Sequence, residues 1–339
     1  MMQPIKPATT IAQQIRLLTD RGMTVDERQA SQWLSQVHYY RLSGYWYPYR
    51  RPIDAVTRAD EFLPNTDFAS VAALYEFDRK LRSLVLDGLE RVEVALRSQI
   101  SQILGLRGPL AHRSPQEFRP TFQHGAWVQK AGQRVQRASK NSSFVQHHLA
   151  KYGPSLPIWV LVEVLDFSDL SILFEGLRTR DQYTVAAGMG LDVDLTRLSK
   201  RQARSAKKEH PLARWLQQLS IVRNVCAHHA RLWNMSFVPA SGTALRSVPG
   251  LGSLPQQSER VYGALLLTGF LLQTISPGTS WPHKLRGLVD ESFLPIEYRT
   301  VGEMGFPDDW RREALWEAPA PASPPPMTIR SHPRRNSHE

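Results

Sequence analysis

The residues best suited to chemistry lie in the segment Arg223 to His229, which reads RNVCAHH. A histidine titrates near neutral pH and can accept or donate a proton. An arginine keeps its charge and presents a planar fork of donors to phosphate oxygens. Arg223 and His228 together therefore offer charge stabilisation and proton transfer at a phosphate. Asn224 is a candidate to orient His228 or the phosphate through its side-chain amide.

Spacing alone does not single out this pair, because three other Arg–His pairs have a similar separation. They are Arg107/His112, Arg119/His124 and Arg204/His210, and they lie in loop-like or basic stretches without a flanking helical period. Only Arg223 lies in a strongly periodic segment, LARWLQQLSIVRNVCAHHARLWN, which predicts one amphipathic helix over 212–234.

The predicted helix separates the two histidines. Its apolar stripe contains Trp215, Leu219, Val222, Cys226, His229 and Trp233, so His229 is predicted to be a packed, hydrogen-bonded core histidine. His228 falls on the opposite face with Asn224 and Arg231. On a straight helix Arg223 stands about 140° from His228, so either its side chain reaches round or the two groups come from different subunits. The alternative interpretation of Arg223 and His228 is a surface ion-pair face.

Several blocks along the chain resemble the Abi-like family, the AbiD/AbiF group of phage abortive-infection proteins. The blocks are RGMTVDERQASQWL, YYRLSGYWYPYR, LYEFDRKLRSLVLDGLERVEVALRS, KYG, PIWVLVEVLDFSDLS and VRNVCAHHARLWN, spread over residues 14–235. The chain departs from the family pattern at Ser168, where a glycine is expected, and at His38, where an asparagine is usual. The family looks like a HEPN-domain family related to the nuclease domains of type VI CRISPR effectors.

This resemblance implies a HEPN-type endoribonuclease that acts as an antiviral toxin, with Arg223, Asn224 and His228 as catalytic residues. RNA carries its own nucleophile, the 2′-OH, so we expect no cofactor and no metal. One histidine cannot readily be both acid and base in one step, so we expect a homodimer with a composite site. A non-catalytic HEPN-type module that binds RNA or protein is the alternative. The sequence names no antitoxin and no phage-derived trigger.

Three further residues are candidates to support the catalytic set: Glu93, Asp78 and His229. Glu93 precedes Arg97 by one helical turn, which favours a helix-stabilising ion pair; the alternative is a role in supporting the catalytic residues near the motif helix. Asp78 falls on the apolar stripe of the helix predicted over 67–104, and a buried carboxylate needs a partner, for which Arg82 and Arg41 are candidates.

Two segments concentrate the net charge of +11. Residues 107–140 and 197–214 each contain seven basic residues and one acidic residue. Such segments favour a polyanion partner, here RNA, although a solvated basic loop is the alternative for either one. The RNA-binding candidates are Arg134, Arg137, Arg197, Lys200, Arg201, Arg204, Lys207 and Lys208. The aromatic block YYRLSGYWYPYR could stack RNA bases or could pack one subdomain on another.

The remaining features predict an all-α helical bundle, which the resemblance implies is HEPN-like, and a cytoplasmic location. Cys226 is the single cysteine, no secretory signal is evident, and the most apolar stretch, Val261 to Ile275, is too short for a membrane span of about 20 residues. We expect no membrane partner. The predicted organisation is a helical and aromatic N-terminal extension (1–66), a HEPN-like core (67–275), a C-terminal extension (276–317) and a disordered Pro-rich tail (318–339).

Overall fold

The structure, a computed structural model, describes residues 7–317, so the predicted disordered tail lies outside the described residues. The described chain forms thirteen α-helices and two small two-stranded sheets, which confirms the all-α prediction. Within this part of the chain, no helix is both long and apolar enough to cross a membrane.

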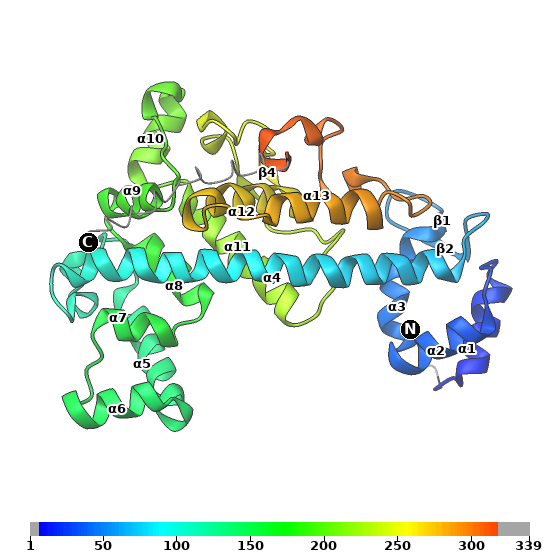
Figure 1. Ribbon diagram of the computed structural model, residues 1–339, viewed down its shortest axis with the longest axis horizontal. Helices are drawn as coiled ribbons and strands as arrows, with labels where there is room; N and C mark the ends of the chain where they lie inside the picture. The colour runs from blue at the N-terminus through cyan, green and yellow to red at the C-terminus, as the bar shows by residue number, and fades with distance from the viewer. Residues whose placement is uncertain (1–6, 318–339) are drawn as a thin grey trace, which may run out of the picture.

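The long helix α4 (Phe68–Gly105) is the axis of the fold, as Figure 1 shows. It was predicted over 67–104, and Asp67 begins it by accepting a hydrogen bond from the Ser70 amide at 2.7 Å. The helices that pack most extensively against it are α11 (Leu212–Ala227), α12 (Val261–Ile275) and α13 (Trp281–Ser292). The motif helix is therefore buried on one side against the most extended element of the molecule.

The N-terminal part consists of three short helices and a hairpin at one end of α4. The helices are α1 (Ile11–Asp20), α2 (Glu27–Gln36) and α3 (Tyr39–Trp46). The hairpin of β1 (Arg50–Pro52) and β2 (Arg58–Phe62) lies where a loop was predicted, because strands of this length leave no detectable alternation. The second sheet pairs β3 (Ala240–Ser241) with β4 (Gln257–Ser258).

Two predicted helices are each divided in the structure. The region 127–151 forms α5 (His124–Asn141) and α6 (Ser143–Tyr152). The apolar stretch after Pro157 forms α7 (Ile158–Leu161) and α8 (Phe167–Gly176), with extended backbone at Leu165 and Asp166 between them. Arg97 of α4 donates to the carbonyls of Val162 and Leu165, at 2.9 and 3.0 Å, and so satisfies the backbone groups that the break frees.

The remaining helices connect this region to the motif helix. They are α9 (Thr179–Gly188) and α10 (Lys200–Lys208). Apolar side chains from Ile15 to Trp316 meet in one continuous hydrophobic core. The N-terminal and C-terminal extensions therefore share that core with the central region, while the boundaries placed at 66 and 275 remain predictions.

Candidate functional site

The motif helix ends inside the motif. The helix α11 stops at Ala227, although the sequence predicted a helix to residue 234. His229 adopts a left-handed backbone with a φ of 56°. Its amide donates to the Cys226 carbonyl at 3.0 Å, and the Ala230 amide donates to the Val225 carbonyl at 3.0 Å. These two bonds form a Schellman end, with histidine at the position that glycine usually occupies.

The prediction that His229 packs in the core was therefore wrong. The helical period no longer applies after His228, and both His228 and His229 are exposed. The Arg41 guanidinium donates a hydrogen bond to the His229 carbonyl, which holds the left-handed turn in place. A non-glycine residue in this conformation costs about 1–2 kcal/mol, so the contact with α3 helps to keep the motif end in one geometry.

Arg223 is held by groups on its own side of the bundle. Its Nη2 lies 3.4 Å from Glu93 Oε2, and its Nη1 donates to Asn224 Oδ1 at 3.0 Å. Glu93 is buried and also accepts from Arg97 at 2.6 Å. Glu93 therefore makes the expected ion pair with Arg97 and also lies beside the motif helix, while its supporting role for the catalytic set stays a prediction. Between residues 7 and 317, no hydrogen bond joins Arg223 to His228.

Asp78 fixes the chain that follows the motif. The carboxylate is fully buried and accepts from Tyr45 Oη at 2.7 Å and from the Trp233 amide at 2.8 Å. It also accepts from the Leu232 amide at 3.2 Å and pairs with Arg82, the partner expected on α4. Burial raises the pKa of Asp78, and the ion pair with Arg82 opposes that rise.

The other predicted partner, Arg41, contacts His229 instead of Asp78. Arg231, predicted beside His228 on a helix, lies in the loop and donates to the Gly44 carbonyl of α3. Leu232 and Trp233 lie beyond the end of α11, so they do not continue its apolar stripe. Both side chains are nevertheless fully buried within the chain. The end of the motif is therefore clamped between α3 and α4.

The two basic segments have different environments. In 107–140 most cations are paired with acids distant in sequence, such as Arg107 with Asp181 at 2.6 Å and Arg119 with Glu209 at 2.7 Å. Arg134 is half-buried and pairs with Asp169 at 2.7 Å, so it belongs to an ion-pair network within the chain. Arg137 is exposed. Counting charges along the sequence could not show this neutralisation.

The second basic segment is exposed. Its candidates all lie in solvent at or just before α10: Arg197, Lys200, Arg201, Arg204, Lys207 and Lys208. None of them has a carboxylate within 4.0 Å among residues 7–317. However, α10 precedes the N-terminal end of α11, whereas His228 follows its C-terminal end. The sixteen residues of α11 span about 24 Å, and Figure 1 shows α10 at one edge of the molecule.

The aromatic block mainly packs the N-terminal helices. Tyr45, Trp46 and Tyr49 are buried, whereas Tyr40 is 80 % exposed. His38, where the family pattern has asparagine, caps α3 by accepting from the Tyr40 amide at 3.2 Å. Asparagine is a preferred capping residue, so the histidine keeps the cap while it adds an imidazole.

The sequence did not reveal a groove of about 590 Å³ beside the end of α11. Residues of α2, α3 and α4 line it together with Cys226 and His229. Cys226 is buried, and burial raises its thiol pKa to about 12, so it is a poor nucleophile near neutral pH. The sequence block next to His38 was the signal that could have indicated this groove. The sequence did not show, however, that this block faces the motif.

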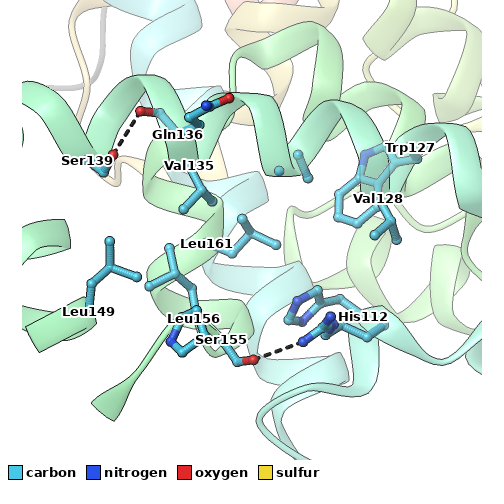
Figure 2. A pocket seen from close by; sticks show the side chains of 14 residues that line it. His112, Trp127, Val128, Val135, Gln136, Ser139, Leu149, Ser155, Leu156 and Leu161 are labelled. Carbon is cyan, nitrogen blue, oxygen red and sulfur yellow. Dashed lines mark hydrogen bonds between the residues drawn. The ribbon is translucent and has the colours of Figure 1, made fainter. Parts of the chain in front are cut away.

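A separate cavity of about 360 Å³ lies between α5 and α6, and no motif residue lines it; Figure 2 shows its lining side chains. Its lining is largely apolar, with Val135, Leu149 and Leu161 among the side chains labelled in Figure 2. His112 also lines it and is buried, and its Nδ1 has no hydrogen-bond partner within the described chain. Burial lowers the pKa of His112 to about 4.

The protein should lose stability as the pH falls from about 6.5 towards 4. Burial lowers the pKa of both His112 and His210 to about 4, so the unfolded chain binds more protons in this range. Each unit of pKa difference corresponds to about 1.4 kcal/mol in the free energy of unfolding. Urea unfolding at several pH values measures the effect, and His112→Phe should reduce the slope. An unchanged free energy of unfolding between pH 6.5 and 4.5 would contradict the assignment of neutral buried histidines.

The fold and the site together define a class of protein: an α-helical bundle with an Arg–His motif at the C-terminal end of a buried helix. A family model described as Abi-like protein matches residues 32–234, and the chain belongs to this family. The match begins later than the resemblance suggested, since the block RGMTVDERQASQWL lies mostly before residue 32. Searches of curated proteins and of solved structures found no match.

Proposed function

We propose that this protein is a metal-independent endoribonuclease toxin of an abortive-infection phage defence system. Membership of the Abi-like family supports the role in phage resistance. The observation that carries the nuclease proposal is the end of α11, where His228 is exposed and Arg223 is only half-buried. A proton-transfer group and a permanent cation thus occur within five residues at a fixed helix end.

The chemistry proposed for these residues is transesterification of RNA. The 2′-oxygen attacks the adjacent phosphorus, the bond from phosphorus to the 5′-oxygen breaks, and a 2′,3′-cyclic phosphate and a 5′-hydroxyl remain. A base must take the proton of the 2′-OH, and an acid must protonate the leaving oxygen. His228 supplies these transfers, while Arg223 stabilises the negative charge on the phosphorane. Asn224 positions Arg223 through the hydrogen bond between their side chains.

The proposed active form is a homodimer with a composite site. The proposed mechanism assigns one histidine of each chain, His228, to two proton transfers, and the ion pair with Glu93 holds Arg223 towards α4. An isologous contact at the end of α11 would bring two His228 side chains to one phosphate. Leu232 and Trp233 are buried within the chain, so they are not available to that contact. The contact would instead use the exposed residues Ala227, His228 and Ala230.

Mixing two inactive variants tests this composite site. Arg223→Ala and His228→Ala subunits should not regain wild-type cleavage when combined, because the composite site of the mixed dimer still lacks one arginine and one histidine. Sedimentation of the wild-type protein should give about twice the chain mass of 38.6 kDa at micromolar concentration. A fully active protein that sediments as a monomer at the assay concentration would contradict the dimer.

An RNA-binding module without cleavage is the second candidate function. The exposed cations of α10 favour it, because they can bind phosphates independently of the distant motif. The complete set of Arg223, Asn224 and His228 favours the enzyme, since a module that only binds RNA does not need these groups together.

A further inference from the structure

The groove beside the end of α11 has the features of a nucleotide-binding site. His38 and Arg41 line one wall, Tyr75 and Arg79 of α4 line the other, and His229 lies at the motif end. Its volume of about 590 Å³ is within the range of pockets that hold small ligands. We propose that this groove binds one unpaired nucleotide of RNA next to the cleaved phosphate, an inference that rests on the proposed function.

The charge of the groove suits a phosphate group. Arg41 donates to the His229 carbonyl, and no carboxylate of residues 7–317 lies within 4.0 Å of its guanidinium. Arg79 pairs with Glu76 at 2.9 Å, but half of its side chain remains exposed. Arg82 is neutralised by a buried carboxylate. One guanidinium is thus uncompensated and a second is accessible, which gives the groove a net positive charge.

The groove also presents an aromatic ring in a fixed orientation. Tyr75 is half-buried, and Trp33 and Tyr45 contact it edge-on at centroid distances of 5.6 and 5.0 Å. The Arg41 guanidinium lies 5.9 Å from the centroid of the same ring. A held aromatic ring with a guanidinium beside it is a platform for a nucleobase. An unpaired base can enter such a pocket, whereas a base in an A-form helix stays stacked.

The position of the groove links it to the reaction. His229 lines the groove and directly follows His228, and neighbouring Cα atoms are about 3.8 Å apart. The basic helix α10 lies at the other end of α11, a helix about 24 Å long. A nucleotide adjacent to the cleaved phosphate can therefore reach the groove of the same chain but not its α10. The groove is the near subsite, and α10 contacts RNA further along the strand.

The test is RNA binding by a protein that cannot cut. In a His228→Ala background, Arg79→Gln should weaken binding of a fluorescein-labelled single-stranded RNA about tenfold, measured by fluorescence anisotropy. It should also reduce the slope of log affinity against log salt by about 0.7, as expected for one lost phosphate contact. His38→Asn keeps the α3 cap but removes the imidazole, and should weaken binding by a smaller factor.

The matched control is Lys80→Gln. Lys80 is the next residue on α4 and loses the same charge, but it lines a different cavity with Glu291 and Pro295. This control should leave affinity unchanged. If wild-type protein cuts RNA while Arg79→Gln binds like Lys80→Gln, the groove proposal is overturned and the nuclease proposal stands. If the wild-type protein does not cut RNA and the His228→Ala variant does not bind it, both proposals are overturned.

Discussion

Replacing His228 by alanine is expected to abolish toxicity and to slow RNA cleavage by the purified protein by roughly 10²–10⁴-fold. The side chain is exposed at the C-terminal end of α11 and makes no hydrogen bond within residues 7–317. The backbone amide of residue 228 still closes the helix by donating to the Asn224 carbonyl at 2.9 Å. The variant should therefore fold normally and keep its melting temperature while it loses activity.

The matched control is His147→Ala, which removes an exposed histidine from α6. Both variants should express at the wild-type level in the same host under the same promoter. Growth arrest by His228→Ala as strong as that caused by wild type would remove this residue from the mechanism. Loss of activity in His147→Ala would show that the assay responds to histidine removal in general.

Replacing Asp78 by asparagine is expected to lower the free energy of unfolding by about 3–5 kcal/mol. The carboxylate is fully buried, and its loss leaves the largely buried Arg82 without its charge partner. The new amide also places donors against the amides of Leu232 and Trp233, which now donate to Asp78. The loop that follows His228 should loosen, so cleavage should fall together with stability. Urea denaturation followed by far-UV circular dichroism measures the change.

Asp87→Asn is the matched control on the same helix. Asp87 also pairs with the arginine four residues later, Arg91, but its side chain is 53 % exposed. An exposed pair of this kind contributes at most about 1 kcal/mol. Equal destabilisation by the two variants would show that Asp78 does not act as a buried anchor for the motif end.

The sequence predicted the central architecture well because long helices carry a strong periodic signal. The helix α4 was predicted within one residue at each end, and Asp67 begins it with an ordinary side-chain cap. The buried stripe of α11 was also correct from Trp215 to Cys226. The predicted pairing of Asp78 with Arg82 followed from one physical requirement, a partner for a buried carboxylate.

The end of the motif could not be predicted in the same way. A left-handed helix end usually carries glycine or asparagine, and His229 gives no such signal. What fixes the turn is Arg41, a residue far away in sequence. The ion pairs of Arg107 and Arg119 likewise depend on contacts between distant segments. Local pattern therefore supplied the candidate residues, but tertiary contacts decide which way they face.

The most direct test of the central claim is cleavage of defined RNA by the purified protein in the presence of EDTA. We predict cutting of an all-ribose oligonucleotide that leaves a 2′,3′-cyclic phosphate or its opened form. The same oligonucleotide with a single 2′-deoxy sugar at the cut position should resist, because the nucleophile is missing there. Complete inhibition by EDTA, or equal cutting of the 2′-deoxy substrate, would contradict the metal-independent mechanism assigned to Arg223 and His228.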